Sequence, residues 1–380
     1  MTTEKNEKAI KVVKTKKLDK ERISKKTLIL AIVLLLVVPI VIFGASAITT
    51  KGKSFIFNLD KKEEKKEEPK EEEPKEEEPV VVENKVKIVN VDSKSRPFAV
   101  MINNIGVARP LQSGLQDAYI IYEIIVEGGL TRYMALFMDQ HTERIGSIRS
   151  SRHYFLDYAL ENDAIYVHHG QSPQAQNDFS ALGVDRISVD ESKTGWRAKG
   201  LGVSYEHTLF TNIEKLNNGV GGKRTTRNKD LLLNYVADPV DMSTIPNNKV
   251  ANNVSITYSN NVVSSYQYDA EAKVYKRFVN GKEHVDWVTK QQYTFKNIIT
   301  YQVYNYPLND GEGKDRQGLE NVGSGTGYYI SEGYAIPIKW SKAGRKEQTV
   351  YTYEDGSILK VNDGNTFIQI QPKNRALNIS

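Results

Sequence analysis

The sequence predicts an α+β fold: a mixed sheet with helices comes first and is followed by a β-rich antiparallel region. Between residues 96 and 218, runs of β-branched and aromatic residues alternate with helix-like segments. From about residue 253 onward, short strand-like runs follow one another, joined by Asn-Gly, Glu-Gly and Asp-Gly turns. No period of 20–50 residues recurs, which excludes a repeat protein.

The individual elements follow from the same patterns. Strands are expected where β-branched and aromatic residues gather, over 97–104, 118–127, 131–139 and 164–170. Helices are expected over 150–161, with Ser150 as a candidate N-cap, over 172–182, with Pro173 in the first turn, and over 223–235.

A hydrophobic segment near the N-terminus predicts the compartment. Residues 28–48 carry no charge and are long enough to span a bilayer core of about 30 Å. The preceding arm, 1–27, holds ten Lys/Arg against four Asp/Glu, which places it in the cytoplasm by the positive-inside rule. We therefore expect a single-pass anchor in the cell membrane and an extracytoplasmic chain from 51 to 380. A small-residue site at 45–47 leaves open a cleaved signal peptide.

The exported chain begins with a tether. Residues 49–84 are rich in Lys, Glu and Pro, and the recurring prolines prevent a continuous helix. Beyond the tether we expect an α+β domain over 85–240 and a β-rich domain over 241–380.

Composition excludes several classes of function. The chain has 52 Lys/Arg and 47 Asp/Glu, and the excess of basic residues lies in the leader rather than on a folded face, which argues against nucleic-acid binding. It contains no cysteine, so disulfides, thiolate catalysis and cysteine-ligated metals are excluded. We expect no metal site and no cofactor, because the three histidines of interest lack a metal-binding spacing.

The candidate site residues cluster in the first domain. Glu123 and Glu127 lie in one apolar strand, and Glu127, beside Gly128-Gly129, is the candidate general acid. Their strand separation of about 13 Å is too large for a two-carboxylate pair, so Glu123 is the weaker catalytic candidate. The remaining candidates are expected to bind substrate: Arg149, Arg152, His168, His169, His207 and Tyr122. Glutamates on a solvated sheet face, neutralised by these arginines, would be an equally simple explanation.

Several long motifs resemble one known family. RPFAVMINN, then ARPLQSGLQDAYIIYEIIVEGGLTRYMALF, IGSIRSSRHYF, DAIYVHHGQSPQA and GNTFIQIQP occur in order between residues 96 and 372. They are similar to the YerB family of bacterial cell-envelope lipoproteins, a domain of unknown function. The resemblance implies a cell-surface protein with an α+β part and a β-rich part. It supplies no catalytic residues, and this chain lacks the lipobox cysteine.

Two functions remain open at this point. The favoured one is cleavage of peptidoglycan glycan strands by a lytic transglycosylase or glycosidase, with a glutamate as general acid. The alternative is a non-catalytic envelope module that binds wall polymer or partner proteins.

Overall fold

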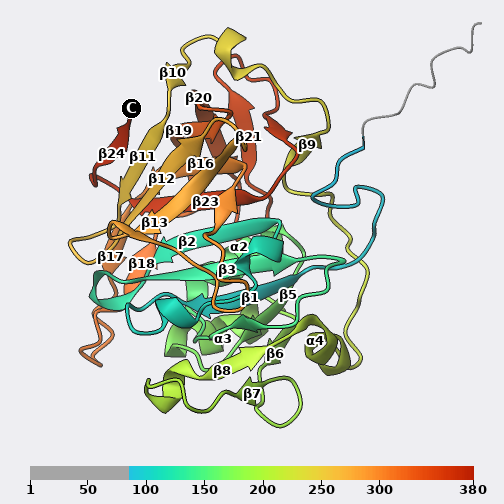
Figure 1. Ribbon diagram of the computed structural model, residues 1–380. Helices are drawn as coiled ribbons and strands as arrows, with labels where there is room; N and C mark the ends of the chain where they lie inside the picture. The colour runs from blue at the N-terminus through green and yellow to red at the C-terminus, as the bar shows by residue number, and fades with distance from the viewer. Residues whose placement is uncertain (1–84) are drawn as a thin grey trace, which may run out of the picture. The chain divides into compact units, whose positions relative to one another are not determined.

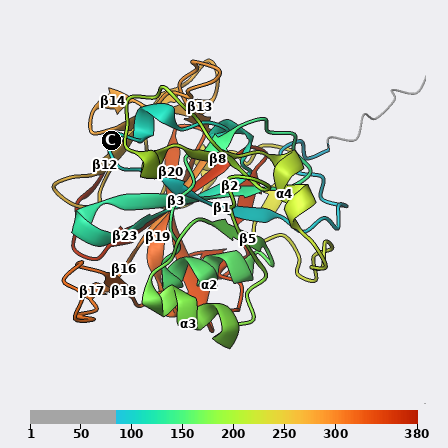
Figure 2. The same ribbon diagram turned by 90° about the horizontal axis from the view of Figure 1, so that it is seen from below.

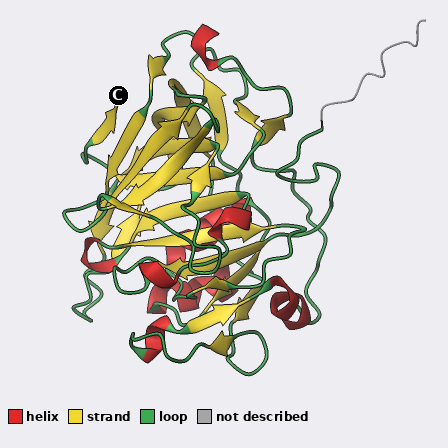
Figure 3. Cartoon of the chain, in the orientation of Figure 1, coloured by secondary structure: helices red, strands yellow, loops and turns green. Residues whose placement is uncertain are grey.

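The computed structural model describes residues 85–380, and the predicted arm, anchor and tether over 1–27, 28–48 and 49–84 lie outside the described residues. Strands dominate the described chain and helices are few (Figure 3), so the fold is β-rich with mixed and antiparallel sheets. Within residues 85–380, none of the helices is both long and apolar enough to cross a membrane.

A large mixed sheet runs through the molecule (Figure 1). Its strands lie in the order β10-β20-β19-β16-β23-β2-β3-β1-β5-β6, with β21 beside β20. Their bounds are β10 Lys249–Val250, β20 Tyr334–Lys342, β19 Gly323–Ser331, β16 Asn297–Val303, β23 Thr366–Pro372, β2 Ile120–Ile125, β3 Thr131–Phe137, β1 Phe98–Asn103, β5 Ile165–His168, β6 Arg186–Ser188 and β21 Val350–Tyr353.

A second sheet covers one face of the first. It has the order β14-β13-β12-β11-β24, and β15 also pairs with β13. Its bounds are β14 Lys282–Glu283, β13 Val274–Val279, β12 Val263–Asp269, β11 Asn253–Thr257, β24 Leu377–Ile379 and β15 Thr294–Phe295. Short pairs and one three-stranded sheet complete the strands: β4 Ile145–Gly146, β8 Leu209–Thr211, β7 Trp196–Arg197, β9 Asn234–Val236, β22 Lys360–Asn362, β17 Asn305–Pro307 and β18 Gln317–Leu319.

The α-helices are α2 (His153–Glu161), α3 (Pro173–Ala181) and α4 (Ile213–Gly219). Short 3-10 turns lie at η1 Arg109–Leu111, η2 Leu115–Asp117, η3 Glu127–Gly129, η4 Tyr205–His207 and η5 Met242–Thr244. Seen from below, α2 and α3 lie together on the side of the large sheet opposite to β12, β13 and β14 (Figure 2). The molecule therefore has three layers at this end: helices, large sheet and second sheet.

The helix expected over 223–235 is wrong. Those residues form turns and bends until β9 begins at Asn234. Arg224 instead pairs with Asp163, at 2.5 Å, and the Asn228 N–H donates to the same carboxylate. Thr and Asn are weak helix formers, so these tertiary bonds decide the conformation.

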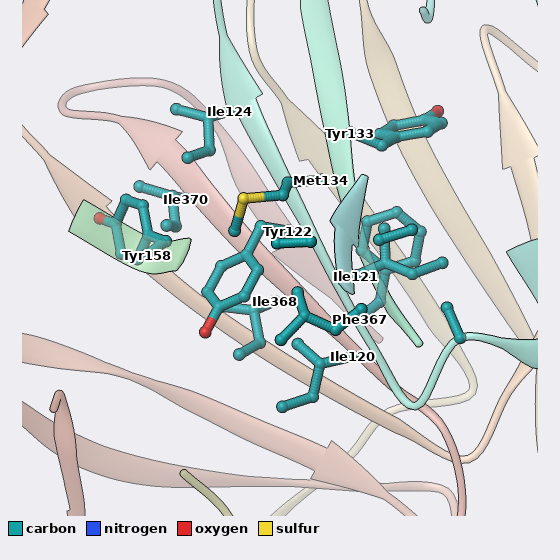
Figure 4. Packing of buried hydrophobic residues seen from close by; sticks show 14 of the residues in the cluster. Ile120, Ile121, Tyr122, Ile124, Tyr133, Met134, Tyr158, Phe367, Ile368 and Ile370 are labelled. Carbon is teal, nitrogen blue, oxygen red and sulfur yellow. The ribbon is translucent and has the colours of Figure 1, made fainter. Parts of the chain in front are cut away.

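Strand β23 departs from the expected antiparallel meander. It runs parallel to β16 on one side and parallel to β2 on the other. Figure 4 shows the packing around it, with Ile368 and Ile370 close to Tyr122 and Tyr158. The large sheet is therefore one continuous layer, built from residues on both sides of position 240.

Candidate functional site

The site lies where the parallel strands β1, β5 and β6 end. The ladder between β1 and β5 stops at Val100 and Val167. Beyond it, the segment 147–151 enters between the two strands: the Arg149 N–H donates to the Met101 carbonyl at 3.0 Å, and the His169 N–H donates to the Arg149 carbonyl at 3.1 Å. Ligands of open sheets with parallel strands bind in this kind of gap, at the carboxyl ends of strands that separate.

Three guanidinium groups converge at this edge. Arg132 is the second residue of β3, Arg149 lies in the inserted segment, and Arg152 is the N-cap of α2. Arg132 is buried, and the positive charges of Arg152 and Arg149 lie nearby. Burial first, and these two charges in addition, lower the pKa of Arg132 to about 9. We call these three residues, with the carboxylates Glu127 and Glu206, the arginine cluster.

Glu127 is held by two of these arginines. Arg152 donates a short hydrogen bond to its carboxylate, and a guanidinium nitrogen of Arg132 lies 3.7 Å from it. Burial alone would raise the pKa of Glu127, but the hydrogen bond and charge of Arg152, with the charge of Arg132, outweigh burial and lower it. Such a carboxylate is ionised at neutral pH and has no proton to donate.

Arg149 has a different partner. Its guanidinium donates to Glu206 at 2.6 Å, and the Glu206 side chain is 56% exposed. Neighbouring His207 is buried. Its Nε2 lies 3.6 Å from the Glu206 carboxylate, and its Nδ1 lies 2.9 Å from the side-chain nitrogen Nδ2 of Asn103. Arg149 is thus paired with a carboxylate that solvent reaches.

The adjacent histidines His168 and His169 face opposite sides of the sheet. Burial lowers the pKa of His168 to about 4, and its ring lies 2.9 Å from the Gly170 carbonyl and 3.3 Å from Arg186. His169 contacts the Val189 carbonyl and Arg197 instead. Within residues 85–380 no three His, Asp or Glu side chains lie together as metal ligands would.

Glu123 does not join the cluster. It is completely buried on the opposite face of β2, where Arg277 donates to it at 2.9 Å and Ser264 at 2.8 Å. Thr131 donates to its other oxygen at 2.7 Å. Because Arg277 and Ser264 come from β13 and β12, Glu123 ties the two sheets together and is closed to a substrate.

Tyr122 is also remote from the cluster. Its ring is buried beside Tyr158, with ring centres 5.1 Å apart (Figure 4), and its hydroxyl donates to Glu161 at 2.7 Å. The alternation of the strand explains this position: Tyr122 faces α2, whereas Glu123 faces the second sheet.

One unusual carboxyl was not among the candidates. Asp157 on α2 lines a cavity of about 330 Å³ together with His153 and Asn321. Burial raises its pKa to about 6, although Arg345, 2.8 Å away, and Asn321 partly offset the rise. An aspartate among the apolar residues of 154–160 was the sequence signal for this position.

The fold and the arginine cluster define a β-rich domain with a cationic site at a sheet edge. The family models for the N-terminal and C-terminal domains of DUF3048, a protein of unknown function, match residues 86–226 and 254–368. The "Putative lipoprotein YerB" of Bacillus subtilis strain 168 is 30% identical over 296 residues, covering 76% of this chain and 85% of the relative.

A solved structure agrees with these matches. The crystal structure of YerB from Bacillus subtilis superposes with a TM-score of 0.63 at 28% identity, covering 75% of this chain and 94% of that one. This chain belongs to the YerB (DUF3048) family.

Proposed function

We propose that this chain is a membrane-anchored, extracytoplasmic module of the cell envelope that binds an anionic group of the wall polymer at the arginine cluster. The anchor is the segment 28–48, with the N-terminus in the cytoplasm and residues 51–380 outside. The similarity to a protein named as a lipoprotein supports membrane association. Peptidoglycan is the polymer that such a module would meet, and its glycan strands carry carboxylates on their peptide stems or, where the stems have been removed, on the muramyl groups themselves.

The observation that carries the proposal is the pairing of Arg149 with Glu206. A guanidinium binds carboxylates through two parallel hydrogen bonds. The Arg149 side chain is 22% exposed, and its present partner is largely in solvent. An incoming carboxylate can therefore replace Glu206 without unfolding any element, while Arg132 and Arg152 keep the local potential positive.

Binding is better supported than glycan cleavage. Cleavage needs a carboxylic acid that holds its proton at neutral pH and reaches the substrate. The pKa of Glu127 is lowered by its arginines, and Glu123 is enclosed between two sheets. Neither glutamate has the environment of a general acid.

Sedimentation of the fragment 81–380 with purified sacculi tests the proposal, since Val81–Ser380 forms one compact unit. We expect the fragment to bind and Arg149→Gln to bind about tenfold more weakly. Arg224→Gln is the matched control, because Arg224 is also paired with a carboxylate but lies beside Asp163, which precedes β5. Release of muropeptides by the fragment, or equal binding by the Arg149 variant, would contradict the proposal.

A further inference from the structure

The short turn that supplies Glu206 also presents an aromatic ring to solvent. Tyr205 precedes Glu206 in η4 and is 63% exposed, more than any other tyrosine of residues 85–380. Because Glu206 pairs with Arg149 at 2.6 Å, the Tyr205 ring belongs to the rim of the arginine cluster.

Three contacts fix the orientation of this ring. The Tyr205 hydroxyl donates to Glu191 at 2.6 Å, and the guanidinium of Arg197 lies over one ring face, 4.0 Å from the ring centre. Arg197 also donates to the Tyr205 carbonyl at 2.7 Å and to Glu191 at 3.1 Å. One ring face is therefore covered by a cation and the other is open to solvent. Since the side chain is already ordered, a ligand that packs on the open face loses little further entropy.

Arg197 connects the ring to the arginine cluster. Its guanidinium lies 3.3 Å from the ring of His169, which is exposed. The His169 N–H donates to the Arg149 carbonyl at 3.1 Å. The exposed side chain of His169 thus lies between the contacts of Tyr205 and those of Arg149, and the three residues form one stretch of surface.

A sugar ring suits this combination of groups. A pyranose has a flat face of C–H groups with small positive charges, which pack on the negative face of an aromatic ring. The Glu191 side chain is 51% exposed and can accept a hydrogen bond from a sugar hydroxyl at the edge of the ring. A carboxylate attached to the sugar then meets Arg149. A carboxylate at the end of a peptide stem is separated from the sugar by many rotatable bonds, so it gains less from Tyr205.

We propose that Tyr205 is a stacking platform for a sugar ring, and that the arginine cluster binds a saccharide whose carboxylate is attached to the sugar itself. In peptidoglycan this ligand is a glycan strand whose stems have been removed. The inference rests on the proposed function, because it needs the carboxylate to bind Arg149. Arg149 selects the charge, and Tyr205 selects the sugar.

The test titrates the fragment 81–380 with the two products of amidase-treated sacculi, the stem-free glycan strands and the released stem peptides. Calorimetry should show that Tyr205→Ala binds the glycan strands about tenfold more weakly than the parent. Tyr205→Phe keeps the ring and should bind as the parent does. Tyr304→Ala is the matched control, because Tyr304 is 51% exposed but lies between β16 and β17. The stem peptides should bind the parent more weakly than the strands do, and equally well to Tyr205→Ala.

Arg149→Gln separates this inference from the proposed function. If Arg149→Gln weakens binding of the glycan strands and Tyr205→Ala does not, the stacking platform is overturned and the anion site stands. If Arg149→Gln binds the strands as the parent does, the proposed function fails and the platform with it. An equal loss of peptide and glycan binding in Tyr205→Ala would show that the variant only disturbs Glu206, which would also overturn the platform.

Discussion

Glu123 and Glu127 lie four residues apart in the sequence, and the fold gives them opposite environments. Glu123 is enclosed between two sheets, and Glu127, two residues beyond the end of β2, contacts the arginines. Removing one partner of a buried ion pair destabilises the fold strongly, because the charge that remains is buried without a counter-charge.

Removing Arg277 tests this cost directly. Arg277→Leu leaves the Glu123 carboxylate buried without its cation, and we expect the free energy of unfolding to fall by about 3–5 kcal/mol. Urea unfolding of the fragment 81–380 measures it. The neighbouring Lys276→Met, on an exposed part of β13, should change stability by less than about 1 kcal/mol. Equal effects of the two variants would show that the buried pair contributes nothing.

The lowered pKa of Glu127 predicts a pH dependence of stability. A carboxyl whose pKa is lower when folded stabilises the protein above its ordinary value of 4.5, and this contribution is lost as the pH falls through the lower folded value. The stability difference between the parent and Glu127→Gln should therefore be largest near pH 7 and shrink below about pH 4.5. Denaturant titrations from pH 7 to pH 3 measure it, with the exposed Glu143→Gln as control. If the stability difference between the parent and Glu127→Gln grew as the pH fell, the pKa of Glu127 would be raised rather than lowered in the folded protein.

Several site residues were predictable because their chain positions imply a shared edge. Glu127 and His169 lie at the ends of predicted strands and Arg149 lies just before a predicted helix, so a common edge for them follows from strand ends meeting at one side of the sheet. Their partners could not be predicted, because Glu206 and Arg277 come from elements far along the chain. Without Arg277, the structural role of Glu123 could not be decided, and the direction of the Glu127 pKa depends on how closely Arg152 and Arg132 approach it in the fold.

The elements that were predicted well depend on local signals. The four expected strands of the first part correspond to β1, β2, β3 and β5, and α2 and α3 lie within the expected helical ranges. The parallel pairing of β23 depends on contacts across the sequence and leaves no local pattern. Ser150 is another difference: α2 begins after Arg152, and its N-cap makes no side-chain hydrogen bond.

Helix caps provide a prediction at this scale. The Ser172 side chain accepts a hydrogen bond from the Ala175 N–H at 3.2 Å, so Ser172→Ala should cost about 1 kcal/mol of stability. Ser150→Ala is the contrasting variant and should change stability by less than about 0.5 kcal/mol, because Ser150 is outside α2. Thermal and urea unfolding of both variants compare them. A larger loss for Ser150 would restore it as the functional cap.

At the scale of the whole molecule, the continuous sheet makes the two family regions dependent on each other. Strand β2 needs β23 as its neighbour, and Glu123 needs Arg277. We expect residues 85–240, expressed alone, to lack the cooperative unfolding transition that the fragment 81–380 shows. Mixing 85–240 with 241–380 should restore it, as measured by circular dichroism on heating. A cooperative transition in 85–240 alone would show that it folds independently.

The position of β23 in the chain also affects how the protein is made. Every other strand of the large sheet precedes it in sequence, yet β23 fills the middle of that sheet. During synthesis, β2 and β16 emerge with the place between them unfilled, and the sheet closes only when residues 366–372 follow. The chain therefore stays open until its last large strand arrives, and a product terminated early would expose two unfinished strand edges to proteases.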